Sequence, residues 1–441
     1  MFAGLMLLAF LAQCVWAAKT RAVSDLEYRY IAAGLPTAAT TSANASPLTG
    51  WVAALPVRLI PQIRRVASPS IRDALAVPRP WILRLPFIIF GLWLGGALWW
   101  VARRLFDDAG GYVALALYCT SPAIIKISSN IGPEIILAWS SLGLIYTAIG
   151  VAHTLYAPPK KWVPRIVILG LSIGFALATA WWSFTLVLMA FGYMMYLAPG
   201  CRKKVLIVLT GATAIGCMVW AAAYWLTGSA GLSVRAILGQ RSWLEAAHDL
   251  ILGLWEGLPL YFLVITSFAI WVNVKPGKRK KLILGQVGLS LAISGMFVLL
   301  QWFSGDAGFA AKVLLAWGHI LGALRTLLFV LSAQTDGYVL VLLFILALTA
   351  YGSWPRARYF GNTAPLITAL AAVFLFSLTP AIRIWDATLG LSFVFIFIGG
   401  LAADFLETRY QRSIGLFLAA CFVLRAVLTV LGLAHWVQNP V

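Results

Sequence analysis

The stretch from Leu83 to Arg104 reads LRLPFIIFGLWLGGALWWVARR, with no charged residue between Arg84 and Arg103. A helix needs about 20 mostly apolar residues to cross the roughly 30 Å hydrocarbon core of a membrane. The length, the composition and the arginines near both ends therefore predict a membrane-spanning helix. Comparable apolar runs recur along the chain, and the predicted spans are 2–18, 84–102, 111–127, 135–155, 164–181, 183–198, 205–226, 257–273, 282–302, 337–352, 364–380, 388–404 and 413–434.

The composition of the whole chain indicates the same class. Of the 441 residues, 62% are hydrophobic and 11% are charged, and the mean hydropathy is +0.91. These values exclude an ordinary soluble domain. We expect an all-α polytopic membrane protein with about thirteen spans. It would form a single transmembrane domain over residues 1–441, with no soluble C-terminal domain. The formal charge of +19 lies in short clusters between apolar runs, which favours membrane lipids over nucleic acid as partners.

The cysteines predict neither a disulfide framework nor a cysteine-based metal site. They lie in or beside predicted spans, at Cys14, Cys119, Cys201, Cys217 and Cys421. The first span lacks a basic segment before it, although Ala17 and Ala18 near its end are compatible with cleavage of a signal peptide. We expect a retained anchor, because cleavage would separate this helix from the acidic segment that follows it.

Basic residues decide the orientation of the predicted spans. With the N-terminus in the cytoplasm, every predicted inner loop carries Lys or Arg, as the positive-inside rule requires. The sequence thus predicts a multi-pass protein of the plasma (inner) membrane whose working surface lies on the periplasmic or extracellular side. The inner clusters are Arg103 and Arg104; Lys160, Lys161 and Arg165; Arg202, Lys203 and Lys204; Lys275 with Lys278, Arg279, Lys280 and Lys281; Arg356 and Arg358; and Arg409 and Arg412.

Long outer loops are predicted at 19–83, 227–256 and 303–336. The apolar run from Gly308 to Leu331 would reverse all later loops if it spanned the membrane, so we expect helices lying at the outer interface in the second and third loops. The first loop is rich in basic residues. They suit either the headgroups of the outer leaflet or an anionic substrate such as a lipid phosphate.

Two carboxylates at the predicted outer face are candidates for chemistry. Only 14 residues are acidic, and a carboxylate beside lipid costs several kcal/mol unless it is solvated or paired. Asp25 follows the first span, and Glu134 lies in the tight outer turn before the span 135–155. The alternative interpretations are structural: Asp25 as the N-cap of a helix over 27–34, and Glu134 as a favourable charge at a helix start after Pro133.

These segments resemble the GT-C glycosyltransferases, polytopic enzymes that take a sugar from a polyprenyl phosphate, and in particular the protein mannosyltransferase and lipid A aminoarabinose transferase branch. The absence of a predicted soluble domain argues against the oligosaccharyltransferase branch. The segments that carry the resemblance, in the order of the family, are DLEYRYIAAGL at 25–35, SPL at 46–48, LRLP at 83–86, ARRLF at 102–106, the stretch 121–134 ending in Gly-Pro-Glu, and Arg383 before Trp385.

The resemblance implies roles for individual residues. Asp25 would be the general base, and Glu134 would orient the acceptor, support a metal ion or tune Asp25. Three basic residues at predicted outer helix ends, Arg84, Lys126 and Arg383, are candidates for binding the donor phosphate. The alternative interpretation is that they extend to lipid headgroups. Because the family often has adjacent Asp and Glu where this chain has Asp25-Leu26-Glu27, Glu27 is the alternative base. The resemblance also leaves open a divalent metal ion as cofactor.

The implied activity is transfer of a sugar from a polyprenyl-phosphate donor to a lipid, glycan or protein acceptor on the outer face of the membrane, with inversion at the anomeric carbon. Two alternatives stay open. A secondary transporter or flippase also fits many spans and a basic entry surface, although transporters usually place ionisable residues near mid-membrane. An inactive scaffold with the same fold fits the altered acidic motif.

Overall fold

In the computed structural model, the described part of the chain is built from helices and short 3₁₀ turns, without strands. The described residues are 2–35, 46–59, 80–180, 183–226, 277–278, 281–286, 288–289, 292, 337–378 and 388–438. Within them, 6 helices are long and apolar enough to cross a membrane, and shorter apolar helices accompany them. The prediction of an all-α polytopic membrane protein is confirmed.

Most predicted spans coincide with a helix to within a few residues. The predicted span 257–273, most of 282–302 and the expected interfacial helices in 227–256 and 303–336 lie outside the described residues. The elements are α1 (Phe2–Thr20), α2 (Asp25–Ala33), α3 (Pro47–Leu59), η2 (Pro80–Arg84), α5 (Leu85–Cys119), α6 (Pro122–Ser128), α7 (Pro133–Thr154), α8 (Pro159–Thr179), α9 (Phe184–Leu197), η4 (Pro199–Cys201), α10 (Arg202–Leu226), α15 (Gly337–Ser353), η6 (Pro355–Ala357), α16 (Phe360–Leu378), α17 (Leu389–Leu406) and α18 (Gln411–Gln438).

The element α5 is a helical hairpin that contains two predicted spans. Its backbone reverses at Phe106 and Asp107, where Asp107 has a φ of 59°, in the left-handed region. Across the turn the arms run antiparallel. The Tyr118 hydroxyl donates a hydrogen bond of 2.5 Å to the Gly91 carbonyl. The predicted inner loop at 103–110 is therefore this tight turn.

The end of the predicted span 111–127 was wrong. The second arm of α5 ends at Cys119, and a separate short helix, α6, begins at Pro122. Proline lacks the N–H that a continuing helix would need, and it forces Ser121 before it into an extended backbone, with ψ 110°. The break leaves α6 as a seven-residue helix at the predicted outer end of the bundle, too short to span a membrane.

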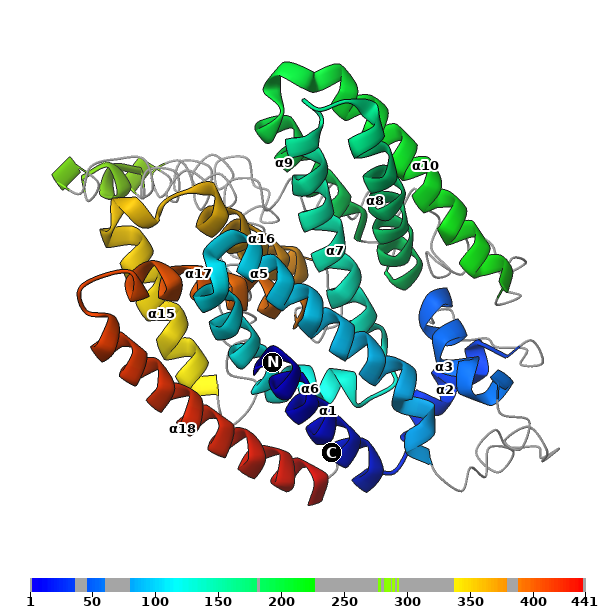
Figure 1. Ribbon diagram of the computed structural model, residues 1–441. Coiled ribbons are helices and arrows are strands. Elements are labelled where there is room, and N and C mark those ends of the chain that lie inside the picture. The colour runs from blue at the N-terminus through cyan, green and yellow to red at the C-terminus, as the bar shows by residue number, and fades with distance from the viewer. Residues whose placement is uncertain are drawn as a thin grey trace, which may run out of the picture.

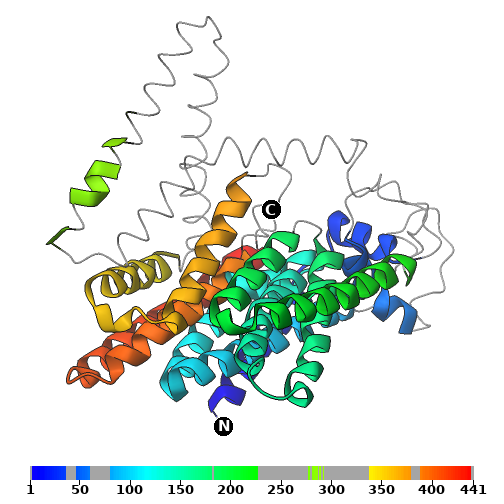
Figure 2. The same cartoon turned by 90° about the horizontal axis from the view of Figure 1, so that it is seen from above.

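The centre of the molecule is formed by α17 packed along α5, with α16 and α7 beside it. Every residue of α17 from Leu389 to Ala403 is buried, as expected for a helix that is apolar all round. In Figures 1 and 2, α8, α9 and α10 stand together on one side of this centre, and α15 stands on the other.

Small residues bring α8 and α10 into close contact. On α8, Gly170 and Gly174 are four residues apart, and a Cβ atom at Gly174 would lie 2.5 Å from the Val219 Cβ of α10. On α10, a Cβ atom at Gly216 would similarly collide with Ile173. This is the small-xxx-small packing by which helices associate in lipid, where no hydrophobic driving force joins them.

The predicted inner loops meet at one end of the bundle. The Phe106 ring of the α5 turn lies 6.3 Å from the Tyr359 ring, and the Tyr359 hydroxyl donates a hydrogen bond of 3.2 Å to Asp404 near the end of α17. Three loops that are far apart in sequence are joined by these contacts.

Two more predicted inner loops reach the same end. Tyr196, at the end of α9, stacks on Phe360 at the start of α16, with 5.9 Å between ring centres. The Lys204 ammonium then donates a hydrogen bond of 3.1 Å to the Leu155 carbonyl after α7. The clustering of these basic loops agrees with the alternation of spans predicted from charge.

Candidate active site

The acidic segment after α1 folds as the short helix α2, and Ser24 is its N-cap. The Ser24 hydroxyl accepts from the Glu27 N–H at 3.3 Å, and the Glu27 carboxylate accepts from the Ser24 N–H at 2.8 Å. This reciprocal pair is a capping box. The alternative interpretation of Asp25 as the cap is therefore wrong, because Asp25 is the first residue inside the helix.

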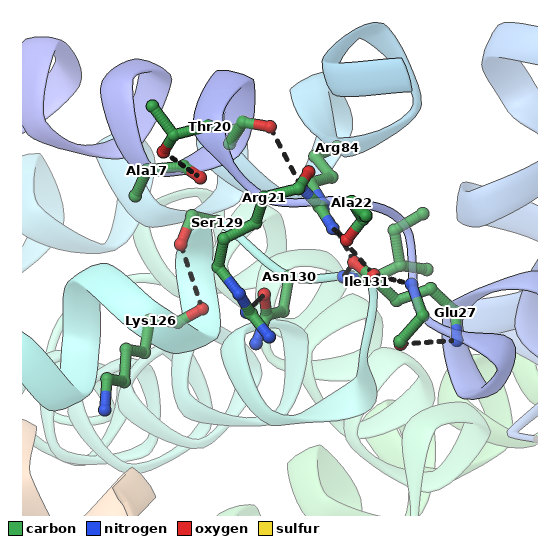
Figure 3. Close-up of polar contacts among 12 residues, drawn as sticks. Ala17, Thr20, Arg21, Ala22, Glu27, Arg84, Lys126, Ser129, Asn130 and Ile131 are labelled. Carbon is green, nitrogen blue, oxygen red and sulfur yellow. Dashed lines mark hydrogen bonds and ion pairs between the residues drawn. The ribbon is translucent and has the colours of Figure 1, made fainter. Parts of the chain in front are cut away.

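A buried ion pair fixes α2 to the start of α5. Arg84 Nε lies 2.8 Å from Glu27 Oε1, and Arg84 Nη2 lies 2.7 Å from Glu27 Oε2, which is the two-pronged geometry that arginine makes with carboxylates (Figure 3). The exposed fractions of the two side chains are 0% and 5%. A pair this well buried must be fully hydrogen-bonded to offset its loss of hydration.

Arg84 meets this requirement by using all of its N–H donors. Beyond Glu27, it donates to the backbone carbonyls of Ala18, Arg21 and Ala22 at 2.8–2.9 Å. A guanidinium has five N–H donors, and these bonds account for each of them. Arg84 has none left for a phosphate in this arrangement, so the geometry gives it a structural role in place of the predicted donor-phosphate role.

Glu27 is engaged as completely as Arg84. Its Oε1 also accepts a hydrogen bond of 3.0 Å from the Ile131 N–H in the turn before α7. Burial alone would raise the pKa of Glu27, but the hydrogen bonds and charge of Arg84, with the two backbone N–H donors, lower it below its usual value. With every lone-pair direction of the carboxylate occupied, the geometry favours Asp25 over Glu27 as a base.

The same hydrogen bond brings the two predicted acidic positions into one region. Glu27 is two residues from Asp25, and its partner Ile131 is three residues before Glu134. The Asp25 side chain is exposed at the start of α2. Glu134 lies in the first turn of α7 after Pro133, with its carboxylate folded over Gly132. Both helix starts face the predicted outer end.

Two cations lie beside this region, around one tryptophan. Lys126 of α6 and Arg21, which follows α1, both lie over the Trp436 ring of α18, with distances to its centroid of 4.7 Å and 4.0 Å. Burial and the charge of Arg21 lower the pKa of Lys126 to about 8. Neither cation forms an ion pair with a carboxylate among the described residues.

No local sequence pattern singles out Arg21 or Trp436. Arg21 was one of many basic residues in the first outer loop, and Trp436 follows the last predicted span by two residues. Their meeting depends on α18 lying beside α1 and α6, which no local sequence pattern signals.

Two further predictions concern Arg383 and a divalent metal ion. Arg383, the third predicted phosphate ligand, lies outside the described residues. For the divalent metal that the resemblance leaves open, the fit is poor in the part of the chain that the structure describes, where no three His, Cys, Asp or Glu side chains cluster. Of the carboxylates discussed above, Glu27 is already held by Arg84.

The arrangement of helices is similar to that of a solved archaeal oligosaccharyltransferase. The archaeal oligosaccharyltransferase AglB from Archaeoglobus fulgidus, solved in complex with an inhibitory peptide and a dolichol-phosphate, matches with a TM-score of 0.51 at 13% sequence identity. The match covers 96% of this chain and 55% of that one. This chain thus spans about half the length of the relative it matches. The likeness in the arrangement of helices indicates a GT-C-like fold.

A second structure of an Archaeoglobus fulgidus oligosaccharyltransferase, a complex with Zn and sulfate, has a TM-score of 0.45 at 15% identity, covering 87% of this chain and 44% of that one. No protein-family model and no curated protein matches the sequence. The GT-C-like assignment therefore rests on the three-dimensional arrangement of the helices.

Proposed function

We propose that this protein is a GT-C-type glycosyltransferase that moves a sugar from a polyprenyl-phosphate donor to a lipid, glycan or protein acceptor at its outer end. The observation that carries the proposal is the Arg84–Glu27–Ile131 connection, which holds the helix of Asp25 against the turn that leads to Glu134. It supports a shared site for two carboxylates whose positions, 25 and 134, are far apart in the sequence. The GT-C-like fold supports the same activity.

In the proposed reaction, an acceptor hydroxyl or amide attacks the anomeric carbon of the donor sugar. The bond from that carbon to the phosphate oxygen breaks, and its electron pair leaves with the polyprenyl phosphate. Asp25 takes the proton released by the acceptor, and Glu134 orients the acceptor. Attack from the face opposite the leaving group would invert the configuration.

The departing phosphate needs positive charge beside it. Lys126 supplies a half-buried ammonium at the outer end, and Arg383 stays a second candidate from the sequence. Arg84 is left out of this role because Glu27 and backbone carbonyls occupy its donors. No step of the proposed mechanism passes through a metal ion.

The direct test is incubation of the purified protein with radiolabelled polyprenyl-phosphate sugars and a panel of lipid, glycan and peptide acceptors. We expect time-dependent transfer of label to one acceptor class together with release of polyprenyl phosphate. Uptake of a free substrate into proteoliposomes without transfer would instead support a secondary transporter or flippase. Absence of both activities in folded protein would support the inactive scaffold.

The proposed location is the plasma (inner) membrane, with the N-terminus in the cytoplasm and the site on the periplasmic or extracellular side. The orientation rests on the basic inner loops. In a background without native cysteines, Thr40→Cys and Glu245→Cys are expected to react with a membrane-impermeant maleimide in intact cells, whereas Lys278→Cys reacts only after lysis. Labelling of the cysteine at 278 in intact cells would contradict the predicted topology.

A further inference from the structure

The cation pair around Trp436 is an arrangement that the ion pair at Glu27 does not explain. Arg21 Nη1 donates a hydrogen bond of 2.8 Å to Asn130 Oδ1, while its Nε is buried and makes no hydrogen bond to any described residue (Figure 3). Lys126 also lies over the ring of Trp436. Among the described residues, the Lys126 ammonium contacts the Trp436 ring and forms no ion pair with a carboxylate.

Holding two cations against one ring is unfavourable unless something compensates the repulsion. Each cation–π contact contributes about 0.5–1 kcal/mol at an exposed site and about 2 kcal/mol when desolvated. A phosphate-type anion makes charge-assisted hydrogen bonds to both cations, which are roughly twice as strong as neutral ones. The ring compensates the repulsion between the two cations only in part. Arg21 and Lys126 are therefore arranged as a binding site for an anion.

We propose that Arg21, Lys126 and Trp436 form one subsite for the phosphate of a lipid phosphate, so that α18, the last helix, supplies a wall of the site. The inference rests on the proposed function in naming a lipid phosphate as the ligand. The indole of Trp436 contacts both cations and would orient them, and the apolar surface of α18 would hold the lipid chain.

The position of α18 fits this role. Many of its side chains are exposed and apolar, among them Val423, Val427, Val430 and Leu431, which is the composition of a helix surface in contact with lipid. Its end reaches the outer cations through Trp436, while Thr429 donates a hydrogen bond of 2.7 Å to the Thr120 carbonyl at the end of α5. The phosphate of such a lipid would thus bind Arg21 and Lys126 at one end of the apolar surface of α18.

The test measures equilibrium binding of radiolabelled farnesyl phosphate to the purified protein in phosphatidylcholine nanodiscs, without any transfer reaction. We expect Arg21→Gln and Lys126→Gln each to weaken binding by about tenfold or more, since a hydrogen bond to a charged group contributes about 1.5–3 kcal/mol. Farnesol, which lacks the phosphate, is expected to bind no better to the wild type than to either variant. Lys126→Arg, which keeps the charge, is the matched control and retains most of the affinity.

The pH dependence separates a ligand from a merely structural lysine. Because Lys126 has a pKa near 8, affinity is expected to fall as the pH rises through 8 in the wild type. Lys126→Arg would show only the titration of the phosphate itself. Titratable groups on the segments packed against α6 include Cys14, Lys19, Arg21, Tyr118, Cys119, Glu134, Arg425 and His435, and all of them are the same in the wild type and in Lys126→Arg.

Competition distinguishes the sources of the anion. Displacement by farnesyl phosphate but not by phosphatidylglycerol supports a polyprenyl-phosphate ligand, and equal displacement by phosphatidylglycerol supports a membrane headgroup in the same subsite. Unchanged affinity and pH profile in folded Arg21→Gln and Lys126→Gln would overturn the subsite. Binding that follows these expectations in a protein without transfer activity would leave the subsite standing and count against the proposed function.

Discussion

Asp25→Asn is expected to lower sugar transfer by at least about a hundredfold, the usual scale on which a general base contributes. The amide is nearly isosteric with the carboxylate but does not accept the proton of the acceptor. The helix itself should be unaffected, because the cap of α2 is Ser24 and Asp25 is exposed at the first helical position. The measurement is the rate of transfer from the labelled donor, with donor binding followed in parallel.

The matched control is Asp108→Asn, the same chemical change at the opposite end of the bundle. Asp108 is exposed there and pairs with Arg103 at the α5 turn. It should retain full transfer. A folded Asp25→Asn protein with transfer close to that of the wild type would remove Asp25 from the proposed mechanism.

The second large effect is expected from breaking the buried ion pair. Arg84→Met should lower the free energy of unfolding by about 3–5 kcal/mol, because it leaves the Glu27 carboxylate buried without its partner. Thermal unfolding in detergent, followed by the loss of helical signal and by aggregation, measures the change. Since the same bond holds α2 near the α7 start, transfer should fall together with stability.

A double-mutant cycle separates the pair from its surroundings. Glu27→Gln combined with Arg84→Met removes both charges, so the double variant should be less destabilised than the sum of the two single variants. Additive effects would show that the two side chains act independently, against the observed geometry.

The pair also predicts an acid dependence. The pKa of Glu27 is lowered in the folded protein, so its carboxylate contributes fully to the free energy of unfolding at neutral pH. This contribution declines as the pH falls below the ordinary glutamate pKa of about 4.3, and it is lost below the pKa of the folded state. In Arg84→Met this decline should be much smaller.

Much of the architecture could be predicted because lipid acts on the chain locally. A spanning helix must be apolar over its whole length and must satisfy its own backbone, so each span is visible as a run of residues. The helices α7 to α10 and α15 to α18 accordingly lie on predicted spans. The prediction failed at Ser121-Pro122, where one proline outweighed an apolar run that continues to Ile127.

The roles of the polar residues could be predicted only in part. That Asp25 and Glu134 share the outer end was predicted from counting spans, but the sequence also made Glu27 an alternative base and Arg84 a phosphate ligand. The tertiary structure places these two in contact and buries them, and each then satisfies the hydrogen bonds of the other.

The sequence by itself determined that this protein is a helical membrane protein, because hydropathy acts through local composition. The side of the membrane that each loop and each carboxylate faces stays a prediction from the placement of charge. Only the tertiary structure decided that Glu27 and Arg84 are joined as an ion pair, and that Arg21 and Lys126 meet at Trp436, more than 300 positions further along the chain. Such pairings depend on the packing of distant helices, and a charged side chain in a mostly apolar chain takes its role from whichever partner that packing brings within reach.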